Sequence, residues 1–118
     1  MLYHYKAYVD SVYDGDTMTV TIDLGFKVKM DKVKLRLLGV NTPELRGGTA
    51  ETKKAGYEAR DFVRNLCLSK EVYVHSVKKG KYGRFIATVW HIDENGQQAS
   101  QSINDLLIEK GLAVEYMK

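Results

Sequence analysis

Two carboxylates separated by one glycine are the first residues in the chain whose types and spacing could support chemistry. Asp14 and Asp16 flank Gly15 in the segment Asp14-Gly15-Asp16-Thr17. Hard cations such as Ca²⁺ and Mg²⁺ prefer oxygen ligands, and a tight turn can direct two carboxylates toward one point. Aspartate and glycine are also ordinary turn residues. The segment therefore favours a cation site without establishing one.

Two arginines and another carboxylate follow in two separate segments. Arg36 precedes a loop that carries Glu44, and Arg84 ends the segment Lys81-Tyr82-Gly83-Arg84. A guanidinium fork matches two phosphate oxygens and stays charged at any useful pH. Arg36 could instead form a surface ion pair, and Glu44 could be an ordinary loop acid.

Taken together, these groups supply what hydrolysis of a phosphodiester demands. A cation polarises the phosphate, two arginines stabilise the additional negative charge of the transition state, and a carboxylate activates or positions water. No Ser-His-Asp or Cys-His pattern competes with them. We interpret the histidines as structural or surface residues and Cys67 as a core residue, because none has metal-ligand spacing. The histidines are His4, His75 and His91.

Alternating apolar and polar residues predict the strands that must position these groups. One face of the second strand carries Met18, Val20, Ile22 and Leu24, and the other carries Thr17, Thr19, Thr21 and Asp23. A period of two is typical of a half-buried strand. Gly25 breaks this run. We expect the remaining strands at 3–13, 32–38, 71–77 and 84–92, with Val33, Leu35 and Leu37 facing inward.

Two segments have helical periodicity instead. The first spans about 50–68 and the second about 100–110, with Gly111 as its C-terminal stop. The first has an apolar stripe of Ala55, Ala59, Phe62, Val63, Leu66 and Cys67, and the second one of Ile103, Leu106 and Leu107. Residues 39–48 should be irregular, because they hold a proline and a Gly-Gly pair. The expected class is mainly β with α (α+β): a five-stranded OB-fold β-barrel with two attached helices.

Length and composition bound the possible functions. A chain of 118 residues predicts one domain, 1–118, which we expect to be monomeric. It has no apolar run of membrane-spanning length and no signal-peptide pattern at its start, so we expect no membrane association. Localisation is cytoplasmic by default, with secretion after removal of a leader as the alternative. Residues 1–84 hold 16 basic and 10 acidic side chains, whereas residues 85–118 hold two and five. This asymmetry suits a polyanion on one face, although it could also be a solubilising surface.

Four motifs in register resemble the staphylococcal-nuclease (thermonuclease) family. They are DGDT, RLLGVNTPE, KYGR and IND-LL-IEKGLA, and the resemblance runs from about residue 6 to residue 116. It implies an OB-fold barrel and Ca²⁺-dependent endonucleolytic cleavage of DNA and RNA with little sequence specificity. We expect the bases to splay toward Tyr82 and Tyr116, which favours single strands over duplexes, and such stacking tolerates any base.

The same resemblance implies a role for each matching residue. Asp16 would be the principal metal-ligating carboxylate, Thr42 would offer its backbone carbonyl, and Asp14 would lie close to the metal without being a main ligand. Arg36 and Arg84 would grip the scissile phosphate. Further matches are Glu44 as the acid that removes a proton from water or orders it, Lys81 and Tyr82 as contacts to a neighbouring phosphate, Tyr116 as a nucleotide-stacking residue, and Asn104 as a packing residue.

Asn41 departs from the family pattern, which has an aspartate metal ligand at this place. The amide oxygen can still coordinate a cation, but one negative charge is lost. We therefore expect weaker Ca²⁺ binding than in a site with all its carboxylates, with Mg²⁺ or Mn²⁺ as alternative ions. The competing functions are a catalytically weak or inactive nucleic-acid-binding module, which Asn41 favours, and an OB-fold binder of protein or sugar.

Overall fold

The computed structural model describes residues 4–43, 49–79 and 84–115. Along the chain its elements are β1 (His4–Asp14), β2 (Thr17–Asp23), β3 (Lys29–Leu37), β4 (Val40–Asn41), α1 (Ala50–Cys67), β5 (Glu71–Lys79), β6 (Phe85–His91), α2 (Ile103–Glu109) and β7 (Val114–Glu115). The bounds of the longer elements lie within about three residues of the sequence expectation. No helix among these residues is long and apolar enough to cross a membrane.

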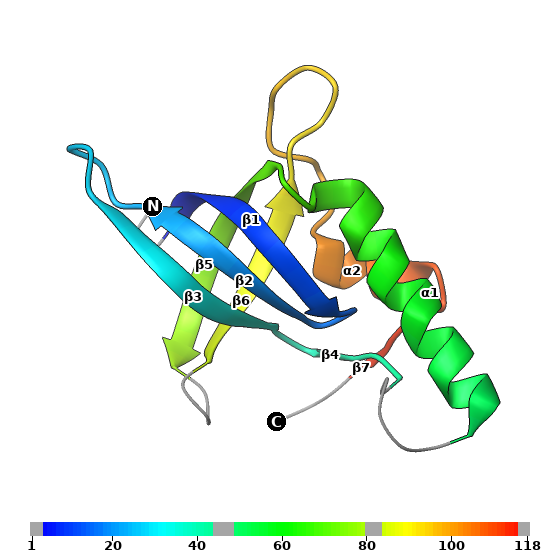
Figure 1. Ribbon diagram of the computed structural model, residues 1–118. Coiled ribbons are helices and arrows are strands. Elements are labelled where there is room, and N and C mark those ends of the chain that lie inside the picture. The colour runs from blue at the N-terminus through cyan, green and yellow to red at the C-terminus, as the bar shows by residue number, and fades with distance from the viewer. Residues whose placement is uncertain (1–3, 44–48, 80–83, 116–118) are drawn as a thin grey trace.

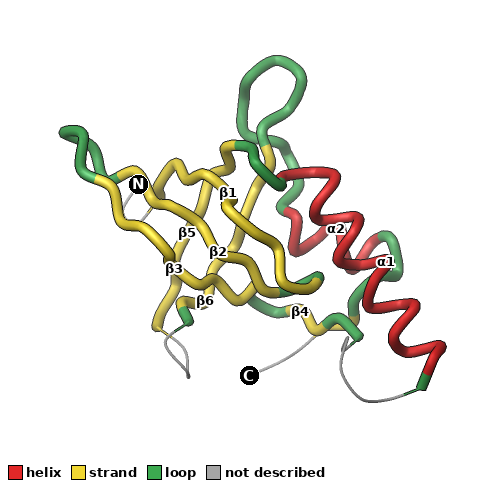
Figure 2. The backbone as a smooth tube through the Cα atoms, viewed as in Figure 1, coloured by secondary structure: helices red, strands yellow, loops and turns green. Residues whose placement is uncertain are grey.

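Five strands close into a barrel in the order β1-β2-β3-β6-β5. The pairs are antiparallel except β3 with β6, which run parallel with Leu35 opposite Phe85. Figures 1 and 2 show α1 and α2 on one side of this barrel, with the turn between β1 and β2 pointing toward them. The prediction of a five-stranded OB-fold barrel with two attached helices is confirmed.

The barrel interior is built from the alternating apolar residues of its strands. Met18, Val20 and Ile22 of β2 are buried, as predicted, and so are Val33, Leu35 and Leu37 of β3. The prediction for Leu24 is wrong, because this residue is 44% exposed. Leu24 lies just past the end of β2, where Gly25 has a φ of +83° and turns the chain away from the core.

Both helices have the caps that their sequences favour. The Thr49 side chain accepts a hydrogen bond from the Thr52 amide at the start of α1, and Ser102 does the same for Asp105 at the start of α2. The second helix thus begins later than the expected residue 100. It ends as predicted at Gly111, whose φ of +72° is the left-handed conformation typical of helix ends.

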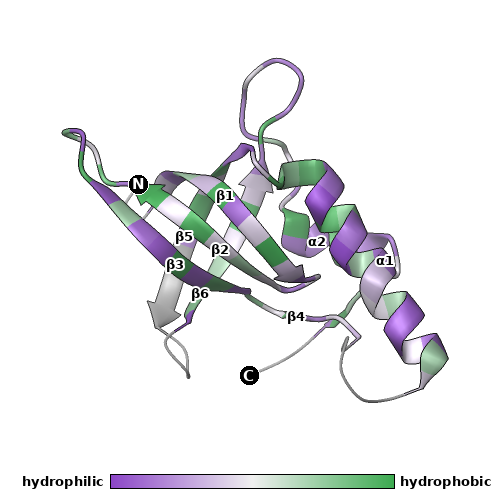
Figure 3. Cartoon of the chain, in the orientation of Figure 1, coloured by the Kyte–Doolittle hydropathy of each residue, from purple (hydrophilic) through white to green (hydrophobic). Residues whose placement is uncertain are grey.

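Each helix buries one apolar face. In α1, Ala59, Val63 and Cys67 of the predicted stripe are buried, together with Gly56. In α2, Ile103 and Leu107 are buried and Leu106 is half-buried. Figure 3 shows the resulting alternation of hydrophobic and hydrophilic residues along α1.

A short second sheet joins two distant segments. Val40 pairs with Glu115 and Asn41 pairs with Val114, so β4 and β7 form a two-stranded sheet beside the barrel. The expectation that residues 39–48 are entirely irregular is therefore wrong for Val40–Asn41. The sheet anchors the start of the loop that carries Asn41 and Thr42 to the end of the described chain.

Asn104 confirms its predicted packing role. Its side chain is buried, its Nδ2 donates to the carbonyl oxygens of Leu38 (2.9 Å) and Ala87 (3.2 Å), and its Oδ1 accepts from the Val89 amide (3.1 Å). One side chain thus connects α2 to β6 and to the turn after β3. This turn leads into β4, so Asn104 helps to position the candidate site.

Candidate functional site

The turn between β1 and β2 lies directly against α1 and the segment after β4. A Cβ added at Gly15 would lie 2.7 Å from Thr42 Cγ2 and 2.8 Å from Ala59 Cβ, which are distances that real Cβ atoms do not reach. Only glycine therefore fits between the two aspartates without displacing a neighbour. Close approach fixes the position of Asp14 and Asp16 relative to Thr42.

Asp16 is the buried centre of this site. The residue is 6% exposed, and its Oδ2 accepts a hydrogen bond from the Thr42 amide at 3.1 Å. Oδ1 accepts from the Thr17 hydroxyl, also at 3.1 Å. Because a buried carboxylate is costly without partners, these bonds and the nearby Arg36 are what allow Asp16 to lie here.

Arg36 is held by one edge of its guanidinium. Nη1 lies 3.1 Å from Asp16 Oδ2 and donates to the carbonyl oxygens of Val40 (2.9 Å) and Leu37 (3.3 Å). Nη2 contacts Asn41 Oδ1 at 3.4 Å. Nε makes no hydrogen bond to the described residues. The Nε–Nη2 edge, which is the fork that binds two oxygens of one phosphate, therefore has donor capacity for a ligand.

Asp14 lies next to Asp16. Its Oδ1 accepts a hydrogen bond from the Asp16 amide at 3.1 Å. Burial, together with the adjacent Asp16 carboxyl, raises the pKa of Asp14 from 3.8 to about 7. A cation beside the two carboxyls would favour the ionised form of Asp14.

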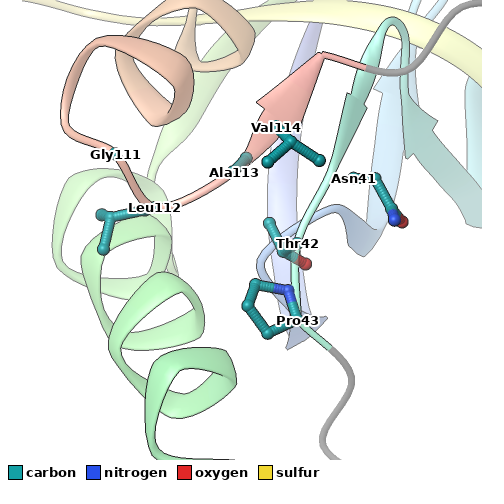
Figure 4. A pocket seen from close by; sticks show the side chains of 7 residues that line it. All are labelled: Asn41, Thr42, Pro43, Gly111, Leu112, Ala113 and Val114. Carbon is teal, nitrogen blue, oxygen red and sulfur yellow. The ribbon is translucent and has the colours of Figure 1, made fainter. Parts of the chain in front are cut away.

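Thr42 and Asn41 complete the described part of the site. Thr42 is 4% exposed, and its Oγ1 has no hydrogen-bond partner among the described residues. Because buried polar atoms are rarely left unpaired, this hydroxyl marks a place for water or a ligand. Beside it lies a cleft of about 220 Å³ between the loop and the segment Gly111–Val114. Figure 4 shows Asn41 directed away from Leu112 and Ala113, on the side where Arg36 contacts it.

The donor types of this site are those that a hard cation takes. Two carboxylates, an amide oxygen and backbone carbonyls are the ligands that Ca²⁺ and Mg²⁺ take. The described residues contain no cluster of three or more acidic, histidine or cysteine side chains. Position 41 contributes an amide and no carboxylate.

Arg84 stands at the entrance to β6, next to the strand that carries Arg36. In the parallel pairing Arg36 lies opposite Ile86, and Arg84 lines the same surface cleft as Asp14 and Lys34. The structure thus brings Asp14, Asp16, Arg36, Asn41, Thr42 and Arg84 to one end of the barrel. Glu44, Lys81, Tyr82 and Tyr116 lie outside the described residues, so their roles stay predictions.

Two positioning residues were missed by the sequence analysis. One is Gly15, which it treated only as part of a turn. The other is Arg64, whose Nε and Nη2 both donate to the Val12 carbonyl oxygen at 3.3 and 2.9 Å, which ties α1 to the end of β1. A basic residue one position beyond the buried Val63 was the only sequence signal for the second contact.

Comparison with known proteins decides which family this site belongs to. Residues 34–118 match the family model described as staphylococcal nuclease homologue. The chain belongs to the staphylococcal nuclease family. The match begins within β3 and runs to residue 118, and therefore includes Arg36, Asn41, Thr42 and Arg84.

Three relatives are similar to this chain over most of the chain's length. It is 32% identical to an uncharacterised protein of Methanocaldococcus jannaschii over an alignment of 134 residues, which covers 97% of this chain and 60% of the relative. The thermonuclease of Staphylococcus hyicus is 32% identical over 104 residues, 86% of this chain and 54% of that protein. Protein ParB of Escherichia coli is 27% identical over 107 residues, which cover 89% of this chain and 54% of that protein. The chain thus spans little more than half the length of these relatives. The family and its relatives support a nuclease-type or nucleic-acid-binding module.

Proposed function

We propose that this chain is a metal-dependent endonuclease that hydrolyses phosphodiester bonds of DNA or RNA with little sequence specificity. The observation that carries the proposal is the arrangement around Asp16. A buried carboxylate, a second carboxyl and an arginine with an open fork lie together, and Asp16 Oδ2 is 3.1 Å from Arg36 Nη1. Such an arrangement supports binding of a cation and a phosphate side by side.

Each side chain has a distinct part in the proposed reaction. Arg36 and Arg84 would hold the scissile phosphate and stabilise the charge that develops on its oxygens. Glu44 would take a proton from the attacking water or hold that water in line. Lys81 and Tyr82 would contact a neighbouring phosphate, and Tyr116 would stack on a base.

The cation site would use the oxygens already described. Asp16, the Asn41 amide oxygen and the Thr42 backbone carbonyl would hold the ion, with Asp14 close by. The buried Thr42 Oγ1, which has no hydrogen-bond partner in the described part of the chain, supports a ligand at this place. When bound, Ca²⁺ would polarise the phosphate and offset its charge. Mg²⁺ and Mn²⁺ remain candidates because a site with fewer carboxylates suits an ion that keeps several waters.

The test is hydrolysis of single-stranded DNA by the purified protein in EDTA, in Ca²⁺, and in Mg²⁺ or Mn²⁺. Cleavage in Ca²⁺ and none in EDTA is expected. Glu44→Gln and Arg84→Ala should each lower kcat at least about a hundredfold while circular dichroism stays native. Cleavage that persists in EDTA, or that both variants retain in full, would refute the mechanism.

A second candidate function is supported by Asn41. The loss of a carboxylate beside Asp16 is the change expected in a module that binds nucleic acid without cleaving it. Such a module would bind single-stranded DNA with an affinity that falls steeply with salt, and would cleave it in none of the metals. A folded protein that binds but never cleaves would therefore decide for this alternative.

A further inference from the structure

A basic cleft with two aromatic rings extends from the candidate site along the outside of the barrel to α1. It has a volume of about 940 Å³, and the lining residues used here are Tyr13, Lys34, Tyr57, Arg60, Arg64 and Arg84. We call it the flanking cleft. Only Arg84 of these six belongs to the catalytic set, and Asp14 also lines the cleft. The flanking cleft is thus continuous with the site but consists mainly of residues without an assigned role.

The lining of the flanking cleft contains four basic side chains and one carboxyl. Lys34, Arg60, Arg64 and Arg84 are basic, whereas Asp14 is the acidic residue among those that line it. Lys34 is exposed and projects from β3 on the same outward face as Arg36, two residues away. Several cations along one cleft attract a polyanion to the surface and hold its phosphates.

The arginines of α1 are oriented by contacts that leave donors available. Arg64 uses Nε and Nη2 on the Val12 carbonyl, and its Nη1 makes no bond to the described residues. Arg60 bonds the Asp61 carboxylate through Nε and Nη2, at 3.1 and 3.0 Å. The side chain of Asp61 is 57% exposed. An ion pair with so exposed a carboxylate contributes little to the free energy of folding, so a phosphate can replace Asp61 as the partner of Arg60.

Two tyrosines supply flat surfaces between the cations. Tyr57 is 43% exposed and Tyr13 is 56% exposed. The Arg60 guanidinium carbon lies 4.5 Å from the centroid of the Tyr57 ring, which holds the ring in place. Tyr57, Arg60 and Arg64 are spaced i, i+3 and i+7 and so share one side of α1. Alternating cations and aromatic rings are typical of surfaces that bind single-stranded nucleic acid.

From this geometry we infer that the flanking cleft binds the nucleotides of a single-stranded substrate beyond the scissile phosphate. Lys34, Arg60 and Arg64 contact phosphates, and Tyr57 and Tyr13 stack on bases. The strand enters or leaves the candidate site past Arg84 and Asp14, where the two regions meet. The inference rests on the proposed function only in the identity of the polymer, because binding along the cleft does not require cleavage.

The experiment measures binding of fluorescent oligothymidylates of about 12 and about 3 nucleotides by anisotropy in EDTA, where the proposed metal-dependent cleavage is absent. The test protein is Lys34→Ala/Arg60→Ala. The matched control is Lys70→Ala/Lys110→Ala, which removes two exposed lysines that do not line the cleft. We expect the wild type and the control to bind the longer strand more than about tenfold tighter than the shorter one. The cleft variant should lose most of this preference.

Salt dependence and a conservative substitution add independent readouts. Loss of two phosphate contacts should reduce the slope of log affinity against log salt for the longer strand by about 1.4. Tyr57→Ala should weaken binding of the longer strand about tenfold or more, whereas Tyr57→Phe, which keeps the ring, should bind like the wild type.

The outcomes separate this inference from the proposed function. An equal loss for both lengths, or a cleft variant that matches the control, would overturn the flanking cleft even if the wild type cleaves DNA in Ca²⁺. If the cleft variant loses the length preference and the wild type cleaves no DNA in any metal, the flanking cleft is supported and the nuclease is refuted. A wild type without affinity for either strand in EDTA would overturn the flanking cleft, whatever the cleavage assay in Ca²⁺ shows.

Discussion

At the scale of single residues, Asn41 distinguishes this site from one with three carboxylates. Its Oδ1 lies 3.4 Å from Arg36 Nη2, and Arg36 in turn lies 3.1 Å from Asp16. The arginine is therefore shared between a carboxylate and an amide. Compared with an aspartate, a neutral residue at position 41 offsets less of the positive charge that Arg36 presents to a phosphate. It also places less negative charge beside a cation.

Asn41→Asp should tighten divalent-ion binding. An added unit charge at contact distance near a surface is worth about 1–4 kcal/mol, and a divalent ion would gain more, so the dissociation constant for Ca²⁺ should fall at least about tenfold. Isothermal titration of the variant and the wild type with Ca²⁺ measures this. Asn41→Ser, which keeps an oxygen without the charge, is the control. Identical titrations of wild type and Asn41→Asp would remove position 41 from the cation site.

Asp14 predicts how stability depends on pH in the absence of metal. Its folded-state pKa of about 7 exceeds the ordinary value of 3.8, so the folded protein binds this proton more tightly than the unfolded chain does. The stabilisation is complete below about pH 4 and is lost as pH rises toward 7. In EDTA, Asp14→Asn should raise Tm relative to the wild type at pH 8 and change it little at pH 4. Equal shifts at both pH values would show that Asp14 does not titrate in this range.

At the scale of elements, the turn between β1 and β2 depends on its contact with α1. Gly15→Ala would force a methyl group against Thr42 and Ala59. Overpacking of this kind costs about 1–3 kcal/mol, and here it would also shift Asp16 away from the Thr42 amide. We expect a lower free energy of unfolding and weaker Ca²⁺ binding, measured by urea titration and calorimetry. Gln97→Ala, in an exposed loop, should change neither. A Gly15→Ala protein as stable as the wild type would contradict the close packing.

The elements show where sequence reasoning succeeds and where it stops. Strong periodicity predicted β2, β3 and α1, because each buries one face and the hydrophobic residues repeat accordingly. The pairing of β4 with β7 was not predictable, because two residues are too few for any period. The Leu24 error has a related cause, since alternation does not tell where a strand leaves the core.

At the scale of the whole molecule, the site assembles segments that are distant in sequence. Thr42 bonds Asp16 across 26 residues, and Arg64 bonds Val12 across 52. Residue types alone suggested the chemistry of Asp16, Arg36 and Arg84. Their convergence followed from the resemblance to a family, since no local pattern encodes which loops meet. The flanking cleft was missed because its cations come from different elements, and the sequence analysis examined each element separately.

Cys67 reports on opening of the whole fold. Cys67 is the last residue of α1 and its side chain is fully buried, and burial raises the pKa of its thiol from 9.0 to about 12. Because the thiolate is the reactive form, a thiol reagent at pH 8 should modify the native protein very slowly, at a rate that follows global unfolding in denaturant. Gln97→Cys in a Cys67→Ser background is the exposed control and should react at once. Fast modification of Cys67 in the native protein would show that α1 opens independently of the barrel.

The alternation along β3 also has an evolutionary consequence. Val33, Leu35 and Leu37 point inward, whereas Lys34 and Arg36 occupy the intervening outward positions. Residues that build the barrel interior and residues that face the candidate site are therefore neighbours in sequence but lie on opposite faces of one strand. A substitution at an exposed outward position such as Lys34 can therefore change the surface beside the candidate site and leave the inward set untouched. In such a barrel function can diverge faster than the fold.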